Sequence, residues 1–269
     1  MRKCLRNVEQ MSKVVILVVG VLFLAGCSSS KKASKISMAE NVFEVKLDTT
    51  EMFDMARDRK IPVAFYSPKT ERKSVHQKVV IFSHGYGANK GGDNLIYSYL
   101  TENLASKGYF VVSIQHELPT DSLLPTTGIP QITRKSNWER GTENIKFVLN
   151  KLKETKPDLD YKHVVLIGHS NGGDMTALFA GKYPDQVDRI ITLDNRRMLL
   201  PRARQPRVLS LRSSDLPADE GVLPSEAEQQ KFGMKIYKLR NTKHSEMDND
   251  ATEIQRKEIN DYIVSFLLD

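Results

Sequence analysis

A G-x-S-x-G motif between a strand-like and a helix-like segment is the feature that most constrains the fold of this 269-residue chain. Gly168, Ser170 and Gly172 follow the apolar run 164–167, and a helix-like stretch continues to Lys182. In this context the motif is typical of a sharp strand-to-helix turn, which holds a strained serine with its hydroxyl exposed. Small residues are needed on both sides because the turn brings neighbouring backbone close. The motif therefore predicts a nucleophilic serine at the end of a strand.

The rest of the chain alternates between strand-like and helix-like segments. Apolar, β-rich runs predict strands at 42–47, 61–66, 79–83, 109–114, 163–167, 189–193, 207–211 and 234–239. Helices are predicted at 93–106, 138–153, 172–182, 225–231 and 252–268. The alternation predicts an α/β fold with a mostly parallel central sheet flanked by helices on both faces. The first two strands have no helix between them, which predicts an antiparallel hairpin at one edge.

A second glycine-bearing loop follows the predicted strand at 79–83. It reads Ser83-His84-Gly85-Tyr86-Gly87. An enzyme of acyl transfer needs two backbone N–H donors directed at the oxyanion that develops on the substrate. The residue after the nucleophile, Asn171, would supply one donor, and Tyr86 is the candidate for the other. A plain tight turn is the alternative for this loop taken alone.

A nucleophilic serine needs a base, and the base needs a carboxylate that orients it. His244 is the only histidine after Ser170, and it lies in the loop between the last predicted strand and the last helix. Asp194 directly follows the predicted strand 189–193, and Asp215 lies four residues after the end of the next predicted strand, 207–211. Both strand ends point to the same edge of the sheet, so either carboxylate could reach His244. The structural alternatives are an ion pair for Asp194 and a turn role for Asp215.

These motifs together resemble the α/β-hydrolase superfamily, from about residue 61 to the C-terminus. The chain is most similar to the platelet-activating-factor acetylhydrolase and dienelactone hydrolase types. It shares with the former the Ser-His-Gly-x-Gly loop, a strand followed by His116, the Gly-His-Ser-x-Gly-Gly motif, and an apolar strand that ends in Leu-Asp. The commonest arrangement in the superfamily implies Asp215 as the acid, whereas the acetylhydrolase type implies Asp194, which we favour. No metal or organic cofactor is implied.

The expected function is hydrolysis of a small-molecule carboxylic ester by Ser170, His244 and Asp194. One alternative is an amidase or peptidase, because the three residues do not select the leaving group. Another is a cell-envelope binding lipoprotein that uses a hydrolase scaffold without turnover. The proline-containing segment 117–135 is long enough to predict a lid or binding wall, with an ordinary surface loop as the alternative.

The N-terminal segment predicts export and lipid anchoring. Residues 1–13 hold four basic residues and one acidic residue, and the apolar run 14–25 is too short to span a bilayer. The run ends in Leu24-Ala25-Gly26-Cys27, which resembles the bacterial lipobox, whose cysteine is acylated and becomes the new N-terminus. We therefore expect a lipoprotein signal peptide at 1–26, a flexible tether from lipidated Cys27 to residue 40, and a single α/β-hydrolase domain at 41–269. Translation could start at Met1 or at Met11.

Processing of this signal also changes the charge and the expected partners. The chain carries a formal charge of +7, of which residues 1–26 contribute +3, so the mature chain carries +4. This modest charge argues against a nucleic-acid partner. The lipobox resemblance implies a membrane partner, through the lipid at Cys27, and a place in the bacterial cell envelope. Ser28 resembles the pattern that permits sorting to the outer membrane where there is one.

Overall fold

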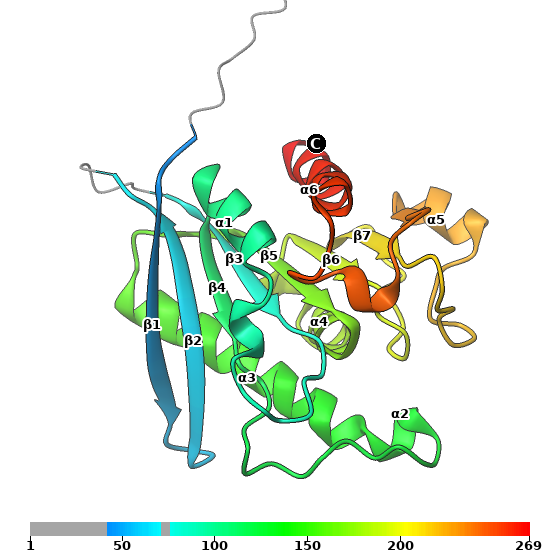
Figure 1. The fold of residues 1–269 in the computed structure, drawn as a ribbon, viewed down its shortest axis with the longest axis horizontal. Coiled ribbons are helices and arrows are strands. Elements are labelled where there is room, and N and C mark those ends of the chain that lie inside the picture. The colour runs from blue at the N-terminus through cyan, green and yellow to red at the C-terminus, as the bar shows by residue number, and fades with distance from the viewer. Residues whose placement is uncertain (1–41, 71–75) are drawn as a thin grey trace, which may run out of the picture. The chain divides into compact units, whose positions relative to one another are not determined.

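The computed structural model describes residues 42–70 and 76–269. The predicted signal peptide, the tether and Cys27 lie outside the described residues, so the boundaries at 26 and 40 stay predictions. The described chain forms an eight-stranded sheet in the order β1-β2-β4-β3-β5-β6-β7-β8 (Figure 1). This crossover order follows from parallel strands that are joined by helices.

All the strands predicted from the sequence are present. They are β1 (Val45–Asp54), β2 (Arg59–Pro68), β3 (Lys78–Ser83), β4 (Phe110–Ile114), β5 (Asp160–His169), β6 (Arg189–Leu193), β7 (Arg207–Arg212) and β8 (Lys235–Lys238). β1 and β2 form the antiparallel edge hairpin, β2 also pairs antiparallel with β4, and the pairs from β4 through β8 are parallel. The mostly parallel α/β sheet is thus confirmed. β1 runs well past the predicted 42–47, because its side chains are mostly exposed and carry little hydrophobic pattern.

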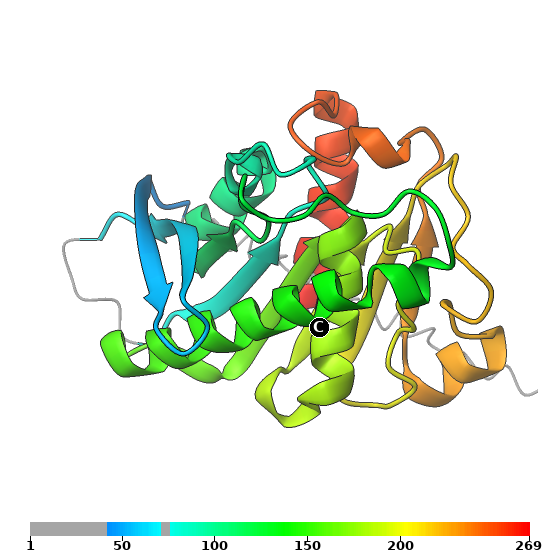
Figure 2. The same ribbon diagram turned by 90° about the horizontal axis from the view of Figure 1, so that it is seen from below.

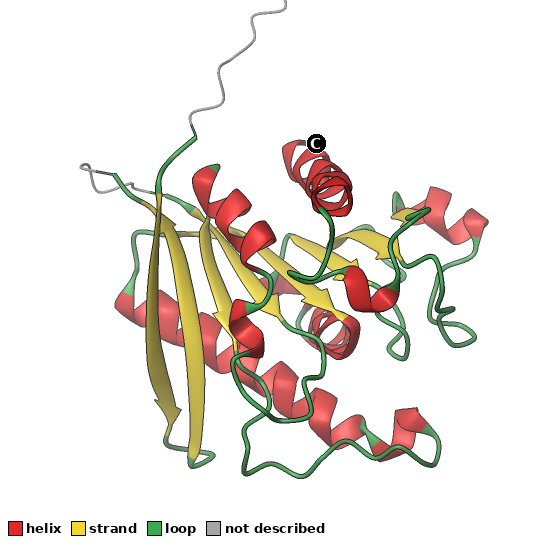
Figure 3. Cartoon of the chain, in the orientation of Figure 1, coloured by secondary structure: helices red, strands yellow, loops and turns green. Residues whose placement is uncertain are grey.

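Helices cover both faces of the sheet (Figure 3). The α-helices are α1 (Ser98–Ser106), α2 (Pro130–Thr133), α3 (Lys135–Thr155), α4 (Ser170–Lys182), α5 (Glu226–Phe232) and α6 (Glu253–Leu268). Short 3-10 turns are η1 (Asp93–Leu95), η2 (Pro184–Gln186) and η3 (His244–Glu246). Figure 2 shows α3 running along one face of the sheet, with α2 directly before it. No helix within 42–70 and 76–269 is both long and apolar enough to cross a membrane.

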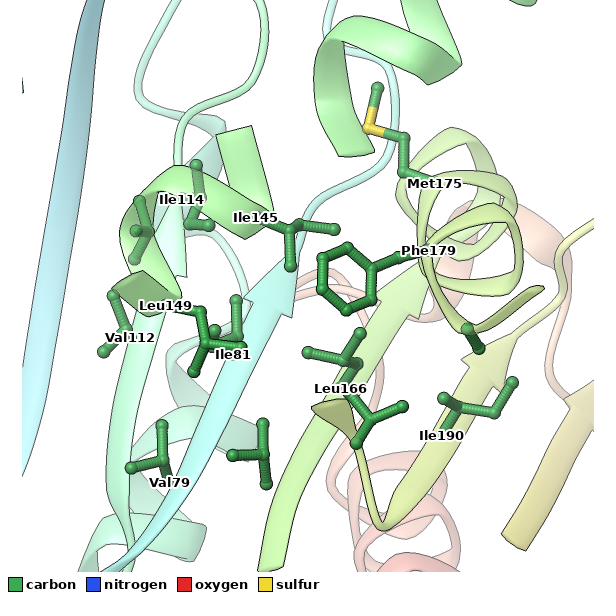
Figure 4. Close-up of a cluster of buried hydrophobic side chains, with 14 of the residues drawn as sticks. Val79, Ile81, Val112, Ile114, Ile145, Leu149, Leu166, Met175, Phe179 and Ile190 are labelled. Carbon is green, nitrogen blue, oxygen red and sulfur yellow. The ribbon is translucent and has the colours of Figure 1, made fainter. Parts of the chain in front are cut away.

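Two hydrophobic layers sandwich the sheet. Val79 and Ile81 of β3 belong to the layer under α3 and α4, whereas Val80 and Phe82 belong to the layer under α1 and α6. Figure 4 shows the first layer, in which Phe179 of α4 lies among side chains from the strands and from α3. Strands buried on both faces read as continuous apolar runs, which is why the sequence predicts the central strands well.

Candidate active site

The serine of the G-x-S-x-G motif lies at the junction of β5 and α4. β5 ends at His169 and α4 begins at Ser170, whose φ of 50° is in the left-handed region that non-glycine residues rarely adopt. A Cβ atom on Gly172 would collide with the backbone carbonyl oxygens of Ser83 and His84. Glycine at this position therefore lets the turn pack directly against the end of β3.

His244 lies between the serine and a carboxylate. Its Nε2 is 2.9 Å from Ser170 Oγ, and its Nδ1 is 2.6 Å from Asp194 Oδ2. In the tautomer with the proton on Nδ1, the imidazole donates to Asp194 and accepts from the serine hydroxyl. Asp194 is fully buried, while the His244 side chain is 19% exposed. A substrate can therefore approach the imidazole, whereas the carboxylate is shielded.

Asp194 is held as an anion although it is buried. Its Oδ1 accepts the backbone N–H of Ser213 at 2.9 Å and pairs with Arg212 Nη2 at 2.8 Å. Burial raises the pKa of Asp194, but the hydrogen bonds from His244 and Ser213 and the charge of Arg212 outweigh burial and hold its pKa below the ordinary value. The carboxylate is therefore ready to accept the hydrogen bond from His244 Nδ1–H.

The other candidate acid contacts the same histidine at a different atom. Asp215 Oδ1 accepts the backbone N–H of His244 at 2.8 Å. The structure thus brings Asp194 to the imidazole ring and Asp215 to the main chain of the loop. Both carboxylates reach His244, as their strand ends predict, and only Asp194 is placed to orient the ring.

The two predicted oxyanion residues lie on segments that meet at the serine. The Asn171 N–H is in the first turn of α4, where backbone N–H groups have no acceptor within the helix. Tyr86 lies in the loop after β3, and the close packing of Gly172 on Ser83 brings this loop beside the turn. The Tyr86 hydroxyl also accepts the N–H of Leu124 at 3.0 Å, which ties the loop to segment 117–135.

The comparison with protein families matches residues 74–194 to Hydrolase_4, described as serine aminopeptidase, S33. The fold and this match agree. The fold is that of α/β hydrolases, and the chain is similar in sequence to the matched family over 121 of its 269 residues. The matched family is one of serine hydrolases, and the serine, histidine and carboxylate of such an enzyme lie within hydrogen-bond distance here. The comparison with curated proteins finds no match.

Similar solved structures support the same fold. A dienelactone hydrolase-like promiscuous phosphotriesterase from metagenomic libraries aligns over 83% of this chain and 97% of its own, with 18% identity and a TM-score of 0.62. A fungal esterase from Rhizomucor miehei aligns over 85% of this chain and 84% of its own, with 15% identity and a TM-score of 0.61. Esterase 2 of Thermogutta terrifontis aligns over 84% of this chain and 96% of its own, with 13% identity and a TM-score of 0.58.

A buried histidine that sequence reasoning did not assign links three loops of this hydrolase. His169 Nδ1 lies 2.7 Å from the Tyr97 hydroxyl, and His169 Nε2 lies 3.0 Å from the His244 carbonyl. Tyr97 also accepts the N–H of Gly85 at 3.0 Å. Burial lowers the pKa of His169 to about 3, so the ring is neutral near pH 7 and donates from Nε2. No sequence pattern pairs residues so far apart.

The segment 117–135 is an irregular loop that ends in α2. Trp138, which follows it, is fully buried, and its Nε1 donates to Asn171 Oδ1 at 2.7 Å. The tryptophan thus packs behind the nucleophile. Farther along, Gln131 Nε2 donates to Asp219 at 2.8 Å, which joins α2 to the loop after β7. The role of this segment as a lid stays a prediction.

Proposed function

We propose that this hydrolase cleaves carboxylic esters of small molecules through a covalent acyl-enzyme. The observation that carries the proposal is the position of His244, 2.9 Å from Ser170 Oγ and 2.6 Å from Asp194 Oδ2. A nucleophile, a base and an orienting carboxylate in this order are the requirements of serine acyl transfer. The esterases among the structural neighbours support an ester as the substrate.

In this mechanism Ser170 Oγ attacks the ester carbonyl while His244 Nε2 takes the hydroxyl proton. Asp194 keeps the imidazole in the correct tautomer and stabilises the imidazolium that forms. The backbone N–H groups of Tyr86 and Asn171 bind the oxyanion of the tetrahedral intermediate. The imidazolium then protonates the leaving alcohol. In the second half, His244 takes a proton from a water that attacks the acyl-enzyme, the acyl–Oγ bond breaks, and His244 returns the proton to Ser170 as the carboxylic acid is released.

The description of the matched family favours a second candidate, which is cleavage of an amide bond at the end of a peptide. The same three residues serve both reactions, so the substrate decides between them. Turnover of p-nitrophenyl acetate is compared with that of leucine p-nitroanilide, an amide that carries the free amino end of a peptide. We expect hydrolysis of the ester at a far higher rate than the amide, and faster amide cleavage would favour the second candidate.

The same assay tests the nucleophile. Ser170→Ala should lower kcat for p-nitrophenyl acetate by about 10³-fold or more, since it removes the attacking atom. Ser265→Ala, at an exposed position of α6, is the matched control and should keep wild-type turnover. Full activity of Ser170→Ala would overturn the proposed mechanism.

We also propose that the mature protein is held in the bacterial cell envelope by lipid on Cys27. The support is the basic segment, the short apolar run and the sequence Leu24-Ala25-Gly26-Cys27. One acyl chain binds a membrane only marginally, whereas two or more hold a protein firmly. An anchor of this kind would keep the hydrolase near esters of the envelope or of the surrounding medium.

A further inference from the structure

A buried carboxylate that the proposed mechanism does not use lies behind the nucleophile. Glu117, in the loop after β4, is 1% exposed. Its Oε1 accepts one N–H from Asn171 Nδ2 at 3.0 Å and another from Asn137 Nδ2 at 3.1 Å. Because a carboxylate is rarely buried without strong partners, these bonds hold Glu117 at a defined place.

Both N–H donors and the carbonyl oxygen of the Asn171 side chain form hydrogen bonds within this cluster. Its Nδ2 donates to Glu117 Oε1 at 3.0 Å and to Asn137 Oδ1 at 2.8 Å, and its Oδ1 accepts from Trp138 Nε1 at 2.7 Å. A flipped amide would set oxygen against the carboxylate and N–H against the indole N–H. The four residues, which we call the Asn171 network, therefore allow one orientation of the amide.

The Asn171 network joins the loop after β4 and the start of α3 to the catalytic turn. Glu117 follows β4, Asn137 and Trp138 lie in the first turns of α3, and Asn171 is the second residue of α4. All four side chains are buried, so water does not compete for their hydrogen bonds. The rigidity of the cluster is transmitted to the peptide group of Asn171, because its Cα carries both the fixed side chain and the N–H.

We propose that Glu117, Asn137 and Trp138 are positioning residues that fix the backbone N–H of Asn171 for the tetrahedral intermediate. The inference rests on the proposed function, in which that N–H binds the oxyanion. A donor that is already oriented needs no rearrangement as charge develops, and loss of one such donor typically lowers kcat by about 10²–10³-fold. Because the oxyanion is absent from the bound ester, the effect falls on kcat more than on KM.

A charge swap tests this directly. Asn171→Asp places a second carboxylate against Glu117 and removes both N–H donors, so kcat for p-nitrophenyl acetate should fall about 10²-fold with little change in KM. Adding Glu117→Gln returns a donor to the pair and restores the net charge, so the double variant should regain at least about 10-fold in kcat. Glu117→Gln alone should lower kcat less than Asn171→Asp does, since the carbonyl oxygen of glutamine can still accept an N–H from Asn171 or Asn137.

Controls separate positioning from a general loss of folding. Asn103→Asp makes the same substitution at an amide that donates to Asn260 at 2.8 Å, between α1 and α6, and should keep wild-type kcat. Every variant is assayed at least 10 °C below its own Tm. If Asn171→Asp does not fold, Trp138→Phe removes the indole donor together with part of the buried ring, and we expect about a 10-fold loss in kcat at unchanged KM.

The outcomes distinguish this inference from the proposed function. If the wild type neither turns over the ester nor reacts at Ser170, the proposed function fails. If the wild type is active and folded Asn171→Asp or Trp138→Phe keeps wild-type kcat, the positioning role is wrong. A double variant that regains its Tm but not its kcat would also overturn it, because the cluster would then support only folding.

Discussion

At the scale of single residues, His244 is held at three different atoms. Asp194 accepts from ring Nδ1, Asp215 accepts from the backbone N–H, and His169 donates to the backbone carbonyl. The remaining ring nitrogen faces Ser170. The base is thus fixed in its tautomer by one carboxylate and in its position by two other groups. The two carboxylates that the sequence offers therefore have different tasks.

This division of tasks predicts unequal losses from two matched substitutions. Asp194→Asn should lower kcat for an ester by about 10³-fold or more, because the amide no longer stabilises the Nδ1–H tautomer. Asp215→Asn should lower kcat less than about 10-fold, since the amide oxygen of asparagine still accepts the backbone N–H of His244. Steady-state kinetics of both variants measure the two losses. The Tm of Asp194→Asn shows whether removing the charge that pairs with Arg212 also destabilises the fold. Equal losses, or a larger loss for Asp215→Asn, would contradict the assignment.

Asp174 in α4 predicts a pH-dependent contribution to stability. Its Oδ1 accepts three backbone N–H groups, from Arg196, Arg197 and Met198, but burial raises its pKa from 3.8 to about 6. The folded state therefore binds this proton more tightly than the unfolded state. The resulting stabilisation is complete below pH 3.8 and is lost as the pH rises towards 6.

Asp174→Asn mimics the protonated group at every pH. The free energy of unfolding of the variant, relative to wild type, should therefore rise between pH 4 and pH 7 by roughly 2 kcal/mol. Urea unfolding at one-unit pH steps measures the difference, in which the titrations common to both proteins cancel. A difference that stays flat over this range would show that the carboxylate has an ordinary pKa.

Among the three glycines of α4, Gly172 and Gly181 have opposite requirements. A Cβ atom at Gly172 would collide with the carbonyl oxygens of Ser83 and His84, whereas nothing lies within 4 Å of a Cβ atom at Gly181. Backbone at the end of β3 cannot move aside as a flexible side chain does. The first glycine thus serves the close approach of two elements, and the second only weakens the helix.

Alanine at the two positions should give opposite results. Gly172→Ala should displace the catalytic turn and abolish ester turnover, or prevent folding. Gly181→Ala should keep activity and raise the free energy of unfolding by about 0.5 kcal/mol, because alanine is the better helix former. Circular dichroism and esterase assays of both variants measure this. An active, stable Gly172→Ala variant would contradict the packing described for the turn.

How far the sequence predicts the elements depends on their burial. The strands β3 to β7 are buried on both faces, and their continuous apolar runs identify them. β1 escapes this pattern because it is an exposed edge strand, so its predicted span ends at residue 47 instead of Asp54. Predicted helix 138–153 is extended to Lys135–Thr155, since polar end turns carry no apolar periodicity.

In the candidate site, local motifs predict some residues, and the three-dimensional packing decides the others. One motif identifies Ser170, and the Ser-acid-His chain order that the α/β-hydrolase resemblance implies leaves His244 as the base, so both are predicted before the structure is seen. Parallel strand ends bring Asp194 and Asp215 to one edge, and only the loop geometry decides which carboxylate meets the ring. The Asn171 network depends on how α3 is rotated about its axis, which no local pattern in the sequence records.

For the whole molecule, we predict that lipid on Cys27 anchors the protein to a membrane. In a bacterial host, wild-type protein should incorporate an alkyne-labelled fatty acid and sediment with membranes, and Cys27→Ser should lose both properties. Cys4→Ser is the matched control and should change neither, since Cys4 lies upstream of the expected cleavage. Persistent labelling of Cys27→Ser would contradict the lipid anchor, and so would loss of labelling in Cys4→Ser.

In the proposed mechanism, Ser170 is a nucleophile activated by His244 and Asp194. A fluorophosphonate probe, followed by mass spectrometry of the labelled peptide, tests it most directly, because only an activated serine reacts at a useful rate. We predict a single adduct on Ser170 in folded wild type and in Ser265→Ala, and none in Ser170→Ala, in His244→Ala or after heat denaturation. Absence of an adduct on the folded wild type, or an adduct on another residue, would contradict the assignment of Ser170 as the activated nucleophile.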